Sequence, residues 1–232
     1  MHRDKRQHSE IKEEIAKKMK NFYKELPEGY KQDKVVDAKN VGFAVAMNVA
    51  ALVLTVLAYI AIDFAISGKI TFADMIKFAF DGDGESDSWV RGYLINVLLP
   101  LVTFIVSMLV YFVLHELVHG MAYKILTREK LTFGITWSAA YCGVPGLYVG
   151  KKTALIALLS PFVVFSAVFI TAAAILGGGI YCFMLKILFA IHFGGCVGDL
   201  YDTMLLLTRY RKKEVLLSDD GPKQVFYIKE VE

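Results

Sequence analysis

The sequence predicts an all-α membrane protein with about four transmembrane helices, an N-terminal amphipathic helix and a short cytoplasmic β-hairpin or re-entrant loop. Three observations lead to this fold class. Hydrophobic residues make up 56% of the 232 positions, compared with roughly 45–50% in ordinary soluble domains. Four apolar runs reach the length of about 20 residues that a helix needs to cross a bilayer. Lysines and arginines gather in the segments between and beside these runs.

The four apolar runs predict the four transmembrane helices, and they cover residues 41–66, 92–114, 153–176 and 177–207. The first run carries only Asp63, near its far end, and the second and third carry no charge. The fourth contains Lys186, His192, Asp199 and Asp202. Lys186 lies toward the outer end of this run, so we expect its amine to extend outward to the lipid headgroups.

The distribution of basic residues predicts the orientation, because loops rich in Lys and Arg stay in the cytoplasm. The segment before the first run, the loop between the second and third runs and the beginning of the tail are all basic. The loop between the first and second runs is acidic. Both termini are therefore expected in the cytoplasm. We divide the chain into a basic amphipathic segment (1–40), a transmembrane domain (41–207) and a cytoplasmic tail (208–232).

The N-terminal segment has the spacing of an amphipathic helix. Its apolar positions, with lysines between them, are Ile11, Ile15, Met19, Phe22 and Leu26. Pro27 and Gly29 would end such a helix. A basic amphipathic helix of this kind either lies on the anionic leaflet of a membrane or packs against the cytoplasmic loops.

The loop at residues 131–150 differs from the rest of the chain because it is rich in strand-forming residues, Trp137 and Tyr141 among them. The sequence from Gly143 to Gly146, which includes Pro145, is a turn signal. We therefore predict a short β-hairpin or a re-entrant loop between the second and third helices.

Charge and cysteine content exclude other classes of protein. The net charge of +3 is small and no basic face alternates with aromatics, so no nucleic-acid partner is expected. The three cysteines are scattered and form no disulfide framework. Cys196 is expected to pack as a small residue. The oligomeric state does not follow from the sequence.

The second apolar run ends in the motif His115-Glu116-Leu117-Val118-His119. Residues four apart share one face of a helix, so both imidazoles can bind a single zinc ion. Glu116 can reach a water molecule bound to that ion and accept its proton. Ionisable side chains are costly inside a membrane and persist where they pair or function. The motif therefore predicts Zn²⁺ as cofactor, with His115 and His119 as ligands and Glu116 as general base.

A catalytic zinc site usually has three protein ligands and one open position, and the fourth run supplies candidates for the third ligand. His192, Cys196 and Asp199 are spaced by four and three residues and so form one stripe on a helix. We choose Asp199 as the third ligand, with Asp202 one turn further on as the alternative. His192 is expected to contact either the substrate or the ligands themselves.

In the third run, Ser160-Pro161 predicts a kink. Backbone carbonyls freed at a kink can line a polar cavity, although a kink can also be tolerated for packing alone.

Four motifs of the chain together resemble the zincin peptidases of bacterial membranes, a family similar to the site-2 proteases. They are Leu26-Pro27-Glu28-Gly29-Tyr30, His115 to Gly120, Ser160-Pro161-Phe162 and Gly198-Asp199-Leu200-Tyr201. The resemblance implies an integral protein of the bacterial cytoplasmic membrane, and it implies that Asp199 is the aspartate ligand on a later helix. The chain departs from the site-2 pattern in two places, with His192 near the position of an asparagine and Leu200 after the aspartate.

The leading interpretation is a membrane-embedded zinc metalloprotease that hydrolyses membrane-associated proteins or peptides with zinc-activated water. The alternative is a non-catalytic zinc-binding membrane protein that acts through partner binding. Replacing Glu116 by Gln separates the two, because it spares the ligands and removes the base.

Overall fold

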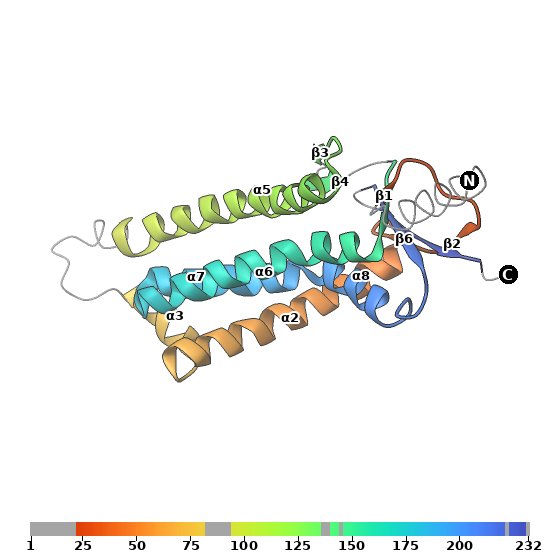
Figure 1. Ribbon diagram of the computed structural model, residues 1–232. Helices are drawn as coiled ribbons and strands as arrows, with labels where there is room; N and C mark the ends of the chain where they lie inside the picture. The colour runs from red at the N-terminus through yellow and green to blue at the C-terminus, as the bar shows by residue number, and fades with distance from the viewer. Residues whose placement is uncertain (1–21, 82–93, 136–139, 144–145, 221–222, 231–232) are drawn as a thin grey trace, which may run out of the picture.

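The computed structural model describes residues 22–81, 94–135, 140–143, 146–220 and 223–230. In these ranges the long helices run side by side, and a small sheet lies at one end of them (Figure 1). The elements in chain order are β1 (Phe22–Tyr23), β2 (Tyr30–Asp37), α2 (Val41–Ser67), α3 (Phe72–Asp81), the single π-helical turn η1 (Leu94–Leu98), α5 (Leu99–Thr127), β3 (Thr132–Ile135), β4 (Ala140–Gly143), β5 (Tyr148–Gly150), α6 (Lys151–Leu176), α7 (Gly179–Gly195), α8 (Val197–Leu207), β6 (Val215–Asp219) and β7 (Lys223–Lys229).

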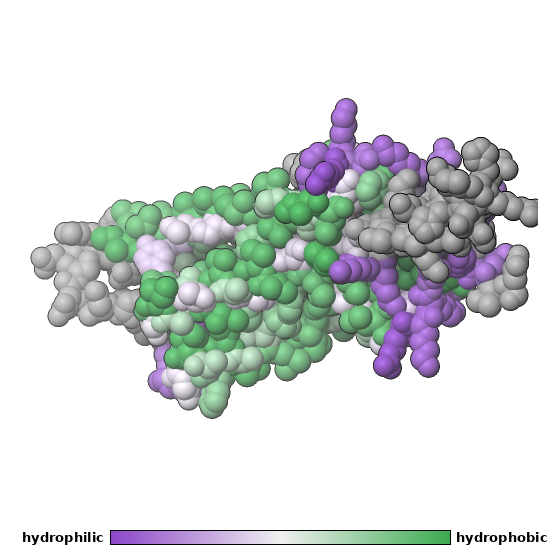
Figure 2. Space-filling model, viewed as in Figure 1, coloured by the Kyte–Doolittle hydropathy of each residue, from purple (hydrophilic) through white to green (hydrophobic). Residues whose placement is uncertain are grey.

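Three helices, α2, α5 and α6, are long and apolar enough to cross a membrane, and α7 with α8 makes a fourth if the bent pair counts as one span. Hydrophobic residues cover the visible face of these helices, whereas hydrophilic residues gather at the sheet end (Figure 2). On α2, for example, Leu52 is 65% exposed although it is strongly apolar. A soluble protein rarely exposes so large an apolar surface. The prediction of an all-α chain with about four transmembrane helices is therefore confirmed in part: the chain is mostly helical and has three to four candidate spans, but it also contains a small antiparallel sheet.

Helix α5 continues well beyond the apolar run that predicted it, to Thr127, and Arg128 caps it in a left-handed conformation (φ 61°). The motif from His115 to His119 therefore lies inside the helix and not at its end. At a rise of 1.5 Å per residue, His115 is about 18 Å along the axis from Thr127.

The fourth apolar run is two helices, and not the single one that its length predicted. Helices α7 and α8 are bent by 44° at a break around Cys196. The bend sets Asp199 in the first turn of α8. A helix N-terminus favours a negative charge, so the break supplies a suitable place for this carboxylate.

The five-stranded antiparallel sheet has the order β1-β5-β6-β7-β2 and was not predicted. It draws strands from both ends of the chain and from the loop before α6. The predicted N-terminal helix is wrong at its end: Phe22 and Tyr23 pair with Val149 and Tyr148 as β1, because Phe22 packs against the core beneath the sheet. The rest of that helix, up to residue 21, lies outside the described residues.

The hairpin predicted between the second and third helices is present as β3 and β4, which pair antiparallel. Its turn is not where the sequence placed it. Ile135 pairs with Ala140 and Thr132 with Gly143, so the turn signal at residues 143–146 does not connect these two strands. Gly146, with φ 75°, instead precedes β5.

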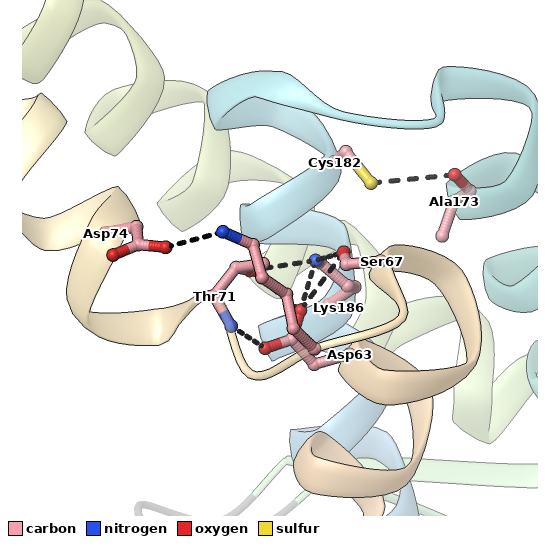
Figure 3. A network of polar contacts seen from close by, with 8 residues as sticks. Asp63, Ser67, Thr71, Asp74, Ala173, Cys182 and Lys186 are labelled. Carbon is pink, nitrogen blue, oxygen red and sulfur yellow. Dashed lines mark hydrogen bonds and ion pairs between the residues drawn. The ribbon is translucent and has the colours of Figure 1, made fainter.

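Lys186 does not extend to the headgroups as predicted. Its side chain is 3% exposed and its amine lies 2.5 Å from Oδ1 of Asp63, which is fully buried (Figure 3). Thr71 donates to the same carboxylate from its backbone N–H at 2.6 Å and from its hydroxyl at 2.8 Å. Two charges shielded from water are stabilised by pairing, and this partner on α2 explains why the lysine turns inward.

Helix α7 also approaches α2 closely at Gly194. A methyl group in place of its hydrogen would overlap Thr55 Oγ1 and lie 2.6 Å from Ala51 O. Small residues allow such close helix contacts in membrane proteins. Gly194 and the Lys186–Asp63 pair therefore hold α7 against α2 at two positions along the helix. Helix α8 follows directly from α7, so these contacts also help to position α8.

Candidate metal centre

The two motif histidines lie on one face of α5, as their spacing of four residues requires, and both are 9% exposed. Asp199 of α8 faces them. Its Oδ2 atom lies 3.3 Å from His119 Nε2 and 3.6 Å from His115 Nε2. The structure thus brings together the two histidines and the first-choice aspartate of the sequence analysis.

These three side chains fit a zinc ion in donor type and in spacing. Their ligand atoms lie within 4.8 Å of one another. Donors about 2.0–2.2 Å from one tetrahedral ion lie roughly 3.3–3.6 Å apart, and the distances from Asp199 to the two histidines fall in that interval. Two imidazoles and one carboxylate leave the fourth position of a tetrahedral ion open.

The second nitrogen of His119 is held by the backbone of α6. Nδ1 lies 2.9 Å from the carbonyl oxygen of Ala157. A carbonyl can only accept, so Nδ1 carries the proton. Nε2 is then the nitrogen that faces Asp199, and this is the ring orientation that a metal-binding histidine needs.

The second nitrogen of His115 is held by Tyr111, one turn earlier on α5. The Tyr111 hydroxyl lies 3.1 Å from His115 Nδ1 and 2.9 Å from His192 Nδ1. His192 Nε2 in turn lies 3.3 Å from Phe162 O and 3.2 Å from Ser166 Oγ. One set of proton positions satisfies the main contacts: His115 donates to Tyr111, Tyr111 donates to His192, and His192 donates to Phe162 O.

His192 is fully buried and belongs to this hydrogen-bonded chain. Asp202 is also buried, one turn beyond Asp199, and its Oδ1 has no hydrogen-bond partner within the described residues. Asp202 is not among the described donor groups close enough to share an ion. Glu116 is half-buried and follows His115 directly in the motif.

Cys196 completes a second donor group that shares His115. The ligand atoms of His115, His192 and Cys196 also lie within 4.8 Å of one another, and Cys196 Sγ is 3.6 Å from His192 Nδ1. The Tyr111 hydroxyl already bonds both histidines of this group. The group with Asp199 therefore matches a hydrolytic site better.

Sequence reasoning missed Tyr111 and the Ala157 carbonyl. Tyr111 stands four residues before His115 and so on its face of the helix, which is a signal that the sequence offered. The carbonyl could be traced only through Pro161, whose missing N–H leaves the oxygen four residues earlier without a helical donor.

Comparison with known proteins matches part of the chain to a family. Neither the search of curated proteins nor that of solved structures found a match. A family model does match, and it covers residues 108–215, the stretch that contains the motif histidines and Asp199. The family implies a zinc cofactor. Over residues 108–215, the chain matches the family described as "Putative zincin peptidase".

Proposed function

We propose that this protein is a membrane-embedded zinc metalloprotease that cleaves peptide bonds of membrane-associated proteins or peptides. The observation that carries the proposal is the convergence of His115, His119 and Asp199 from two candidate membrane spans. His119 and His115 lie about 12 and 18 Å along α5 from Thr127. A bilayer has a hydrocarbon core about 30 Å thick, so this depth favours chemistry within the bilayer or at its edge.

In this proposal His115, His119 and Asp199 hold the zinc ion, which when bound acidifies water and polarises a carbonyl. Glu116 accepts the proton of the attacking water and passes it to the leaving amine. Ala157 and Tyr111 keep the Nε2 atoms of the two histidines directed toward Asp199. His192 acts through Tyr111, and it is too deeply buried to hold a substrate carbonyl.

The membrane placement also rests on the basic segments. The sheet end of the molecule is hydrophilic (Figure 2). The lysines and arginines before α2 and after α8 belong to the chain segments that contribute strands to this sheet. We assign this end to the cytoplasm, with both termini on that side. The similarity to site-2 proteases is part of the same proposal.

A three-variant comparison tests the function. The parent chain, Glu116→Gln and the double variant His115→Ala/His119→Ala are reconstituted into vesicles with a panel of fluorescently labelled single-span peptides. We expect about one zinc per chain in the parent and in Glu116→Gln, and none in the double variant. Only the parent should cleave.

Two results would contradict the proposal in different ways. Equal zinc content in the parent and the double variant would show that His115 and His119 do not form the metal site. Cleavage that survives Glu116→Gln would show that Glu116 is not the general base. If zinc is bound and no peptide is cleaved, the non-catalytic alternative is favoured.

A further inference from the structure

Helix α6 runs without interruption through Pro161, which is fully buried. In an α-helix each carbonyl accepts the N–H of the residue four positions later. For Ala157 that residue is Pro161, which has no N–H. The Ala157 oxygen therefore lacks the donor that the pattern of its own helix would supply, and the proline ring pushes it away from the helix axis.

Ala157 is itself fully buried, and a buried carbonyl without a donor is costly. The donor in this structure comes from another helix, since His119 Nδ1 of α5 lies 2.9 Å from this oxygen. The residue that removes the helical donor and the histidine that replaces it thus meet at one backbone atom.

We propose that Pro161 is a positioning residue for His119: by removing one backbone N–H it reserves the Ala157 carbonyl for His119 Nδ1 and so fixes the tautomer that presents Nε2 to Asp199. Because the carbonyl only accepts, His119 must donate from Nδ1. Nε2 is then the nitrogen that faces Asp199 Oδ2, 3.3 Å away, and it is the one that can bind a metal ion once it gives up its proton.

The consequence for zinc rests on the proposed function, whereas the tautomer of His119 does not. A neutral imidazole binds zinc through an unprotonated nitrogen, and partners that orient a ligand typically change metal affinity by about 10–100-fold. An alanine at position 161 would return an N–H to the helix. That N–H would compete with His119 for the Ala157 oxygen.

The first experiment reads the tautomer in the metal-free parent chain by long-range ¹H–¹⁵N NMR of ¹⁵N-histidine. The chain has only five histidines, and the variant His119→Gln assigns the signal. We expect Nδ1 of His119 to carry a proton that is hydrogen-bonded to the Ala157 carbonyl, whether or not Nε2 is also protonated toward Asp199. A predominant Nε2–H form would overturn the proposal, whatever the metal content proves to be.

The second experiment compares two substitutions that differ in one backbone group. Pro161→Ala restores the N–H, whereas lactic acid at position 161 has the same methyl side chain and an ester oxygen in place of the N–H. We expect Pro161→Ala to lower zinc affinity about 10–100-fold, measured by competition with a chelator, and to mix the His119 tautomers. The lactic acid variant should retain nearly the parent affinity and the Nδ1–H form.

The matched control is Val168→Ala, since Val168 lies on the same helix with a side chain 52% exposed, and it should not change either readout. If Pro161→Ala has the zinc affinity and the His119 protonation pattern of the parent, the proposal is overturned. Equal losses in the alanine and lactic acid variants would also overturn it, because the ring and not the missing N–H would then matter. The two proposals can fail separately. If the parent binds no zinc, the proposed function fails. The role of Pro161 still stands if His119 carries its proton on Nδ1 in the parent and Pro161→Ala disturbs that form.

Discussion

Asp199 Oδ2 lies 3.3 Å from His119 Nε2, although the aspartate belongs to the first turn of α8 and the histidine to the interior of α5. The contact depends on the 44° bend at Cys196, because a straight helix would carry the carboxylate along the axis of α7. The third candidate ligand is therefore set by the break in the helix as much as by its place in the sequence.

The two aspartates of α8 should differ in their effect on zinc. We expect Asp199→Ala to abolish tight zinc binding, because Oδ2 faces both histidines. Asp202→Ala should keep most of the metal, with a loss of at most about 10–100-fold, since Asp202 is not part of the donor group. Parallel zinc titrations in detergent decide between them. An empty site in Asp202→Ala and a full one in Asp199→Ala would reverse the assignment.

Tyr111→Phe removes the hydroxyl between His115 and His192 and should lower zinc affinity about tenfold or more. His192→Ala should have a smaller effect, because it acts on His115 only through Tyr111. The double variant should be no weaker than Tyr111→Phe alone, as residues in one network are not additive. A double-mutant cycle on the zinc affinity measures this. Additive losses would show that His192 acts independently of the tyrosine.

The proposed orientation predicts the positions of three reporter fusions. A reporter at residue 1 and one at residue 232 should both lie in the cytoplasm, and one near Gly84 on the opposite side of the membrane. The basic segments near both chain ends give the reason. Alkaline phosphatase and green fluorescent protein fusions provide paired readouts. A tail on the outer side would mean that α7 and α8 are not one span.

The helices and the grouping of the candidate metal ligands could largely be predicted from the sequence because their signals are local. Run length indicated α2 and α6, and the spacing of four residues placed His115 and His119 on one face. The position of Asp199 on the stripe of the fourth run agreed with the same centre, and the structure brings that side chain to the histidines.

The sheet could not be predicted in the same way, because its strands are short and pair across the length of the chain. Strand β2 pairs with β7, near the opposite end of the sequence, and β1 has only two residues. Hydrogen bonds between helices were also inaccessible. The contacts of His119 with Ala157 and of Lys186 with Asp63 depend on which helices pack together, and the pattern within one helix does not specify its neighbour.

Asp33 lies outside the candidate spans and forms a contact whose contribution to stability should depend on pH. Its Oδ2 accepts from the Tyr210 hydroxyl at 2.7 Å and from Arg209 at 2.9 Å, which ties β2 to the turn after α8. The hydrogen bond from Tyr210, more than that from Arg209, lowers the pKa of Asp33 against the effect of burial. A carboxyl whose pKa is lowered by folding stabilises the fold above its ordinary pKa, about 3.9, and loses this contribution as the pH falls through the folded value.

We therefore expect Asp33→Asn to melt below the parent at pH 7 and the difference in Tm to shrink as the pH falls below about 4. Thermal unfolding in detergent between pH 3 and pH 7 measures this. Glu230→Gln is the control, because its partner Lys31 is on the same sheet and both side chains are exposed, so little change is expected. A Tm difference that stays constant with pH would mean that the charge of Asp33 is not what the contact uses.

The buried pair of Lys186 and Asp63 should be essential only as a pair. Removing one partner leaves a charge in an apolar interior, which typically costs about 3–5 kcal/mol, so Lys186→Met and Asp63→Asn should each destabilise strongly. In the double variant neither charge remains, and the Asn oxygen can still accept the Thr71 N–H that Asp63 accepts now. We expect the double variant to be more stable than either single variant.

The exposed pair of Lys69 and Asp74, whose side chains are 69% and 56% exposed, provides the matched control. Lys69→Met should change stability by less than about 1 kcal/mol. Unfolding by titration with a denaturing detergent, followed by circular dichroism, compares all four variants with the parent. A double variant as unstable as the sum of its parts would show that each charge has a separate role. That result would favour a polar site at this end of α2 over a purely structural ion pair between α2 and α7. If the pair is only structural, removing both charges leaves no unpaired buried charge and should cost less stability than removing one.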